Sequence, residues 1–150
     1  MTVEQNKATL RRFVEEVWNK GNLAVAAEIV SPGLVMYILP PGTPPGLEPF
    51  KRFFAQVRAA FPDVHITIED LVAEGDRVAA RLVMTGTHLG PYFTDAKVPL
   101  PPTGKRFTMK GIDIWRFDEN GKWIECWSTY DRLAQLQQLG AIPVAEPTRS

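Results

Sequence analysis

The chain has 150 residues, which suits one domain of ordinary size and is too short for two. Apolar residues make up 45% and charged residues 23%, a composition of folded rather than disordered chains. The 17 basic residues balance 17 acidic ones, so the chain lacks the basic excess of nucleic-acid binders and has no charge-based attraction to a membrane surface.

Metal-binding and disulfide-forming residues are scarce. The chain has one cysteine, Cys126, and two histidines, His65 and His88. A structural zinc site takes about four such ligands, so we expect no metal, and one cysteine cannot form an internal disulfide. No apolar run approaches the roughly 18 residues of a membrane-spanning helix, and the polar N-terminus does not resemble a signal peptide. We therefore expect a cytoplasmic protein with no membrane or nucleic-acid partner.

The first third of the chain carries helical patterns. Apolar residues recur every three or four positions before Gly21, and this stripe predicts a first helix. Similar spacing predicts a second helix over 23–30 and a third over 47–61. The short apolar run 34–39 predicts a buried strand between the second and third helices.

From residue 64 onward the apolar period changes to two, which predicts strands. The four expected strands run from 64 to a turn at 75–76, over 77–88, over 106–117 and over 122–130. A proline-rich stretch, 90–104, is too long for a tight hairpin, and a short helix over 132–139 follows the last strand. We expect the tail, 141–150, to be loosely attached.

This order of elements defines a fold class. Helices that are segregated from a mostly antiparallel sheet make an α+β fold. The three N-terminal helices must cover one face of a curved sheet, and we expect the resulting cone to enclose an apolar pocket.

The motifs of the chain leave two possibilities, acid–base chemistry by carboxylates or no chemistry at all. It has no glycine-rich dinucleotide loop, phosphate-binding loop or serine nucleophile elbow, and Cys126 is interpreted as a packed thiol. Asp131 is the leading candidate, because it follows the last strand on the same parity as Trp123 and Trp127. Indole neighbours would desolvate this carboxylate and raise its pKa toward that of a general base. Asp131 is equally suited to cap the helix that follows, and the two roles are compatible.

Two further charged residues are candidates for a second polar group. Asp113 lies between Ile112 and Ile114 in an expected strand. The favoured interpretation is that the isoleucines face the core and Asp113 faces solvent, and the alternative is that Asp113 points into the pocket. Arg81 either faces solvent or pairs with a carboxylate inside the pocket.

Six side chains are expected to line the pocket and to contact an apolar substrate. They are Trp127, Trp115, His88, Tyr37, Phe50 and Phe54. Each also has an ordinary structural interpretation. A lone histidine is more often a satisfied structural group than a catalyst, the Tyr37 hydroxyl either donates to a ligand carbonyl or simply packs, and the phenylalanines suit a core.

Several short motifs follow one another in a characteristic order. They are Pro45-Gly46, Phe61-Pro62-Asp63, Gly75-Asp76-Arg77-Val78, Gly86-Thr87-His88, Pro101-Pro102-Thr103-Gly104-Lys105, Gly111 through Trp115, Glu125-x-Trp127 with Asp131, and Leu136-x-x-Leu139-Gly140. As an ordered set, over about residues 5–140, they resemble the SnoaL-like polyketide cyclases of the wider nuclear-transport-factor-2-like (NTF2-like) superfamily.

The resemblance implies a curved sheet around a deep apolar pocket, a homodimer or tetramer, and no cofactor. In family cyclases an aspartate that matches Asp131 is the general acid/base of an intramolecular aldol ring closure of a polyketide ester. We therefore predict a cofactor-independent cyclase that acts on a small apolar carbonyl compound. Two departures stand out: Tyr37 replaces a histidine of many relatives, and the loop Leu89–Pro102 is longer than usual and could act as a lid.

Two alternatives stay open. One is an NTF2-like module that binds a small apolar molecule without turnover. The other is an epoxide hydrolase of limonene type, in which Arg81, Asp113 and Asp131 would imitate an Asp-Arg-Asp set, although the Arg-x-Asp spacing is missing. The environment of Asp131 discriminates between catalysis and binding, since a pocket-facing acid favours the first and an acid that only caps the last helix favours the second.

Overall fold

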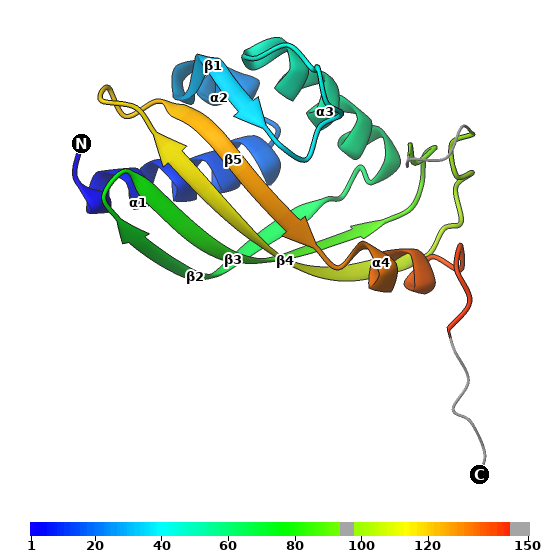
Figure 1. Cartoon of the computed structure of the whole chain (residues 1–150). Helices are drawn as coiled ribbons and strands as arrows, with labels where there is room; N and C mark the ends of the chain where they lie inside the picture. The colour runs from blue at the N-terminus through cyan, green and yellow to red at the C-terminus, as the bar shows by residue number, and fades with distance from the viewer. Residues whose placement is uncertain (94–97, 145–150) are drawn as a thin grey trace.

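The computed structural model describes residues 1–93 and 98–144 and shows helices packed on a single sheet (Figure 1). In chain order the elements are α1 (Val3–Phe13), the π-helical turn η1 (Val14–Trp18), α2 (Leu23–Ile29), β1 (Val30–Met36), α3 (Leu47–Ala60), β2 (His65–Glu74), β3 (Arg77–Thr87), β4 (Arg106–Phe117), β5 (Trp123–Tyr130) and α4 (Arg132–Gln138). The predicted α+β class and the order of elements are confirmed.

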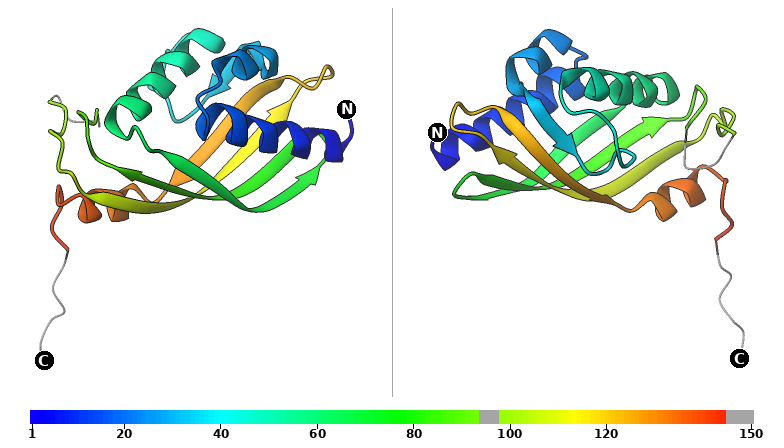
Figure 2. Two further views of the ribbon diagram at one scale, coloured as in Figure 1. Left: turned by 180° about the vertical axis from the view of Figure 1, so that it is seen from behind. Right: turned by 45° about the horizontal axis from the view of Figure 1, so that its top comes forward.

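The sheet is mixed and open, with the strand order β1-β5-β4-β3-β2. Strands β2 to β5 form the predicted antiparallel meander, whereas β1 pairs with β5 in parallel. Figure 2 shows the three N-terminal helices on the concave face of the curved sheet and α4 at one end of it. The helices and the concave face together enclose the core.

The N-terminal helix begins with a capping box. The Thr2 hydroxyl accepts a hydrogen bond from the backbone N–H of Gln5, and the Gln5 side chain accepts one from the N–H of Thr2. The predicted single helix contains the π turn η1, in which the N–H of Asn19 donates to the carbonyl of Val14. This wider turn leaves Val14 and Trp18 both buried against the sheet.

Strand β1 starts earlier than predicted, because it includes the Ser31-Pro32-Gly33 segment that interrupts the helical pattern. Proline is tolerated there since β1 is an edge strand, where a missing N–H leaves no ladder bond unmade. Its pairing with β5 has a register shift between Val30 and Val35.

Strand β4 corrects the predicted orientation of Asp113. Asp113 is only 8% exposed, whereas Ile112 is 53% exposed and Ile114 38%. The prediction that the two isoleucines face the core was therefore wrong. Asp113 shares its parity with four large side chains of the same strand, and burying four large groups outweighs burying two isoleucines. The four are Phe107, Met109, Trp115 and Phe117.

The core is rich in aromatic side chains that join the helices to the sheet. The Phe13 ring of α1 makes edge-to-face contacts with Phe50 of α3 and with Trp115 and Trp123 of the sheet, at centroid distances of 5.1 to 5.2 Å. The two indoles stack at 3.7 Å. Such pairs add to the free energy gained from burial alone.

Helix α4 continues along β4 where β5 ends. The N–H of Asp131 donates to the carbonyl of Lys110, and the side-chain amide of Gln138 makes two hydrogen bonds with the backbone of Thr108, of 2.8 and 2.9 Å. These bonds satisfy the edge of β4 beyond its last pairing with β5, so α4 is held at the end of the sheet.

Two predicted segments fall partly outside the described residues. The proposed lid, Leu89–Pro102, includes 94–97, and the predicted loose tail, 141–150, includes 145–150. In the described part of the lid, Tyr92 and Leu100 form an antiparallel bridge. Gly90 lies directly on α3, where a Cβ atom would come within 2.0 Å of the Ala59 carbonyl oxygen.

In the described ranges, we find no helix with the length and apolar character needed to cross a bilayer.

Candidate active site

An apolar cavity lies between the helices and the concave face of the sheet. The helices contribute Leu10, Val14, Trp18, Phe50, Phe53 and Val57, and the strands contribute Leu82, Met84, Met109, Trp115, Trp123 and Cys126. Its few polar side chains come from β4, β5, α3, α4 and the segment after β3, and they are Asp113, Ser128, Tyr130, Gln56, Arg132, Gln135 and Tyr92. A largely apolar wall with a few converging polar groups is typical of small-molecule sites.

Asp113 lies in the cavity wall and accepts hydrogen bonds from its neighbours on the sheet. The Tyr130 hydroxyl donates to Asp113 Oδ1 over 2.8 Å, and Trp115 Nε1 donates to Oδ2 over 3.3 Å. The Ser128 hydroxyl is a third hydrogen-bond partner of the carboxylate. Three neutral donors therefore fix the orientation of this side chain.

Burial raises the pKa of Asp113 above its ordinary value, although the hydrogen bonds from Ser128, Tyr130 and Trp115 act in the opposite direction. Burial also raises the pKa values of Cys126 and Tyr130 well above their usual ranges, and the nearby Asp113 adds to both effects. Both groups therefore stay protonated near neutral pH. The carboxyl of Asp113 is the group of this cluster that can exchange a proton with a ligand.

A glycine allows Tyr130 to reach Asp113. Gly111 pairs with Tyr130 across β4 and β5, and a Cβ atom on Gly111 would lie 1.9 Å from Tyr130 Cδ1. The tyrosine ring thus occupies the space that any other residue would fill with its side chain. The hydroxyl then lies two residues further along β4, at the carboxylate.

Asp131 is placed differently from Asp113. Its carboxylate accepts a hydrogen bond from the N–H of Ala134 over 3.1 Å, so it is the N-cap of α4. The side chain is exposed and is not among the described residues that line the cavity. The capping role is confirmed, and the catalytic role of Asp131 stays a prediction.

Three of the six predicted wall residues lie on the concave side of the sheet or in the helices that cover it. Phe50 and Trp115 line the cavity. Phe54 lies behind them, where its ring packs 5.2 Å from that of Trp18.

Tyr37 and Trp127 lie on the convex face of the sheet instead. Their rings stack at 5.4 Å, Tyr37 is 54% exposed, and the guanidinium of Arg77 lies 5.2 Å from the Trp127 ring. The cause is an irregularity at the start of β5, where Arg116 pairs with Glu125 but Phe117 pairs with Trp123. The extra residue reverses the parity of the strand after Trp123.

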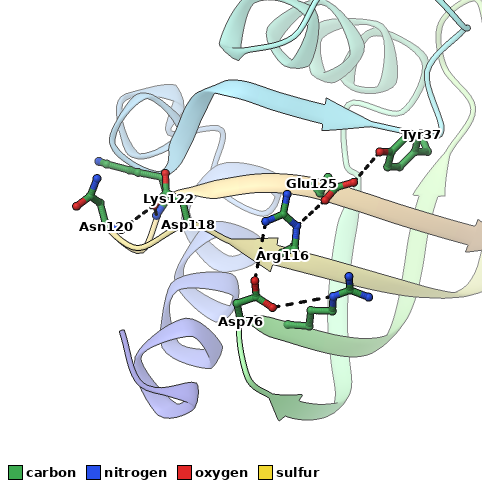
Figure 3. Close-up of polar contacts among 8 residues, drawn as sticks. Tyr37, Asp76, Arg116, Asp118, Asn120, Lys122 and Glu125 are labelled. Carbon is green, nitrogen blue, oxygen red and sulfur yellow. Dashed lines mark hydrogen bonds and ion pairs between the residues drawn. The ribbon is translucent and has the colours of Figure 1, made fainter.

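A network of charged side chains occupies this convex face (Figure 3). The Tyr37 hydroxyl donates to Glu125 Oε2 over 2.6 Å, and Arg116 Nε donates to Oε1 of the same carboxylate. Asp76 lies 3.9 Å from the Arg116 guanidinium. The hydrogen bonds from Tyr37 and Arg116 lower the pKa of Glu125.

His88, the sixth predicted wall residue, is buried away from the cavity. Its Nδ1 accepts a hydrogen bond from the N–H of Thr103 and lies 3.0 Å from the Thr103 hydroxyl. Burial lowers the pKa of His88, against the carbonyl oxygens of Gly90 and Leu100, which raise it. These contacts join both ends of the 90–104 stretch, which agrees with the structural interpretation of this histidine.

Arg81 faces solvent on the convex side, which is one of its two predicted placements. Its guanidinium donates to Asp70 through Nε and Nη2 at 2.8 and 2.7 Å. Arg81, Asp113 and Asp131 therefore lie on the convex face, in the cavity and at a helix cap, respectively. These three residues therefore do not form the Asp-Arg-Asp set that an epoxide hydrolase of limonene type would need, and the prediction that they imitate it was wrong.

The sequence analysis missed six polar residues of the cavity: Gln56, Tyr92, Ser128, Tyr130, Arg132 and Gln135. Ser128 and Tyr130 alternate with Cys126, a signal that the irregularity in β5 concealed. Across 1–93 and 98–144, no three His, Cys, Asp or Glu side chains are placed to hold a metal ion.

Comparison with known proteins identifies the family. The family model of the SnoaL-like polyketide cyclases matches residues 8–139. The chain belongs to this family. A search of curated proteins found none that matches the chain.

Several solved structures are similar to this chain. TsrD from Streptomyces laurentii is 25% identical with a TM-score of 0.83, and the match covers 95% of this chain and 99% of that one. IdmH from Streptomyces antibioticus, a proposed polyketide cyclase, is 30% identical with a TM-score of 0.73, over 91% and 99% of the two chains. A proposed polyketide cyclase from Bacillus cereus is 32% identical with a TM-score of 0.73, over 92% and 82%.

Proposed function

We propose that this SnoaL-like protein is a cofactor-independent cyclase of aldol type, with Asp113 as its general acid/base. The observation that carries the proposal is a single buried carboxyl, oriented by Tyr130 and Trp115, in the wall of an apolar cavity. Membership of the SnoaL-like polyketide cyclase family supports cyclase chemistry. The proposed substrate is a small apolar compound with two carbonyl groups.

The proposed reaction needs one proton acceptor. The ionised Asp113 removes a proton from the carbon next to a carbonyl, and the electron pair of that C–H bond becomes an enolate. The enolate carbon forms a bond to the second carbonyl carbon, and the resulting alkoxide takes the proton back from Asp113. General acid–base catalysis of this kind contributes about 10²- to 10⁴-fold, and folding the substrate in a shaped cavity adds a proximity effect.

The catalytic proposal moves from Asp131 to Asp113 for a physical reason. A base must come within hydrogen-bond reach of the proton it abstracts, and Asp131 is an exposed cap whereas Asp113 lines the cavity. The raised pKa of Asp113 also makes it a stronger base than an ordinary carboxylate. The capping role of Asp131 favours the alternative of a binding module without turnover, so the test must separate the two.

A matched pair of variants, Asp113→Asn and Asp131→Asn, tests the proposal. We would follow deuterium exchange next to the carbonyls of heptane-2,6-dione, and its closure to a six-membered ring, by proton NMR. We expect Asp113→Asn to lower kcat/KM by about 10²- to 10⁴-fold, and Asp131→Asn to retain activity because asparagine also caps helices.

Other outcomes of this test would favour Asp131 as the catalytic residue or a binding module without turnover. Loss of activity in Asp131→Asn alone would return the catalytic role to Asp131. Full activity in Asp113→Asn would overturn the proposal. Binding of the dione by the wild type, with no exchange and no ring closure, would favour the binding module.

We also propose that two chains associate through the convex face of the sheet. Ile112, Ile114 and Val72 are exposed on the sheet strands, and burying such side chains stabilises an interface. Light scattering after gel filtration should give a dimer for the wild type and a monomer for Ile112→Lys. A monomeric wild type would contradict the proposal.

A further inference from the structure

The cavity contains one basic side chain. Of the described residues that line it, Arg132 is the sole cation and Asp113 the sole acid. Arg132 is the first residue of α4, the helix at the end of the sheet, and its side chain is half-buried. The pKa of Asp113 is set by burial and by its hydrogen bonds from Ser128, Tyr130 and Trp115. The Arg132 guanidinium does not lower it.

Arg132 has no acidic partner within the described part of the chain. The ion pairs of residues 1–93 and 98–144 include eight other basic side chains but not Arg132. The neighbouring acid, Asp131, is engaged as the cap of α4. A half-buried cation without a counter-ion has lost part of its hydration, and no ion pair offsets that free-energy cost. An anionic ligand would supply the missing counter-charge.

Gln135 places a second donor beside Arg132. The two residues are three apart on α4 and therefore share a face of the helix. Gln135 is 1% exposed, and its Oε1 accepts a hydrogen bond from the Tyr92 hydroxyl over 2.9 Å. Because the amide oxygen is engaged, the amide nitrogen is the group left to donate to a ligand in the cavity.

We propose that Arg132 and Gln135 bind the carboxylate of the substrate, so that the cavity takes an apolar diketo acid, whose two ketone groups react, rather than a neutral ester. Guanidinium and amide N–H groups match a carboxylate, and charge-assisted hydrogen bonds are about twice as strong as neutral ones. The apolar part of the ligand then extends along the aromatic and methionine side chains toward Asp113. The orientation of the reacting end rests on the proposed function, whereas the carboxylate site does not.

A pair of probes that differ only in charge tests this site. We would titrate the protein calorimetrically with 4-phenylbutanoate and with its methyl ester, near neutral pH and at low salt. We expect the acid to bind the wild type at least about tenfold more tightly than the ester, which corresponds to about 1.4 kcal/mol. Arg132→Met should abolish this preference, because methionine retains the apolar stem but not the charge, and Gln135→Leu should reduce it by a few-fold.

Two controls separate the site from general effects. The methyl ester should bind Arg132→Met as it binds the wild type, which shows that the cavity is intact. Arg81→Met removes one positive charge from the convex face, where Arg81 pairs with Asp70, and should leave the preference for the acid unchanged.

Three results would overturn the carboxylate site: equal affinities of the wild type for acid and ester, a preference that survives Arg132→Met, or no binding of either probe. None of these results depends on turnover. Failure of the Asp113→Asn test would leave the binding data unaffected, so the two proposals can fail separately.

Discussion

Two carboxylates of this chain accept a hydrogen bond from a tyrosine, one on each face of the sheet. In the cavity Tyr130 donates to Asp113 over 2.8 Å, and on the convex face Tyr37 donates to Glu125 over 2.6 Å. Their pKa values nevertheless shift in opposite directions, upward for Asp113 and downward for Glu125. The tyrosine hydrogen bond favours the charged form in both cases, so it cannot explain the difference.

Burial and the presence of a cation decide the direction. Asp113 lies among apolar side chains with neutral donors only, and burial is the largest influence on its pKa. Glu125 lies near the surface and also accepts a hydrogen bond from the Arg116 guanidinium, which favours its ionised form. A carboxylate that accepts a hydrogen bond from a tyrosine therefore has a raised pKa, and is a stronger base, only where it is buried among apolar side chains without a counter-ion.

The largest effect is expected from Gly111→Ala, which would break the Tyr130 contact in the cavity. The added Cβ atom would lie 1.9 Å from Tyr130 Cδ1, so the ring must move away from Asp113. We expect a loss of about 3 kcal/mol in the free energy of unfolding, measured by urea denaturation, together with a fall in kcat. Gly33→Ala is the matched control, because its Cβ atom would meet nothing closer than 3.6 Å. Equal stability of the two variants would contradict this packing account.

A smaller effect is expected from Tyr130→Phe, which removes the donor but keeps the ring. A hydrogen bond to a charged group is worth about 1.5–3 kcal/mol. Its loss raises the pKa of Asp113 further, so the acid limb of the kcat/KM profile should move to higher pH by about one to two units. Tyr37→Phe, on the convex face, should leave the profile in place. An unshifted limb in Tyr130→Phe would exclude Asp113 as the titrating group.

The smallest effects concern the pH dependence of folding stability, which tests the comparison of Asp113 with Glu125 most directly. The folded-state pKa of Asp113 is raised, so stability from its protonated form is present below the unfolded pKa of about 3.9 and is lost as pH rises through the folded pKa. Asp113→Asn avoids that loss, and its Tm should exceed that of the wild type by a margin that widens as pH rises.

Glu125→Gln should behave in the opposite way. The folded-state pKa of Glu125 is lowered, so its contribution is present above the unfolded pKa of about 4.3 and is lost as pH falls through the folded pKa. The variant should melt below the wild type near neutral pH, and the gap should close in acid. Gaps of the same sign for Asp113→Asn and Glu125→Gln would refute the comparison.

The sequence predicted the elements well because their signals are local. The apolar spacing of helices, the period of strands and the turn residues at 75–76 depend on neighbours in the chain. The bounds predicted for β4 agree with the structure, and those of α3 differ by one residue at its end.

The site was harder to predict because it depends on which face each residue occupies. The two isoleucines beside Asp113 suggested an outward aspartate, whereas the parity of the whole strand, with Phe107 and Trp115, indicates an inward one. In β5 one extra residue reversed the parity and moved Trp127 to the convex face. Irregularities of this kind have no local signal, so the place of Asp131 and of the residues beyond it could not be read from spacing.

The chain's single cysteine, Cys126, lies in the cavity wall and is buried. The chain therefore carries a built-in chemical reporter at one site. Because burial holds the pKa of this thiol well above its usual range, alkylating reagents should modify it only when the fold opens locally. The rate of alkylation then measures how often the cavity opens, and a ligand that fills the cavity should slow it in proportion to occupancy.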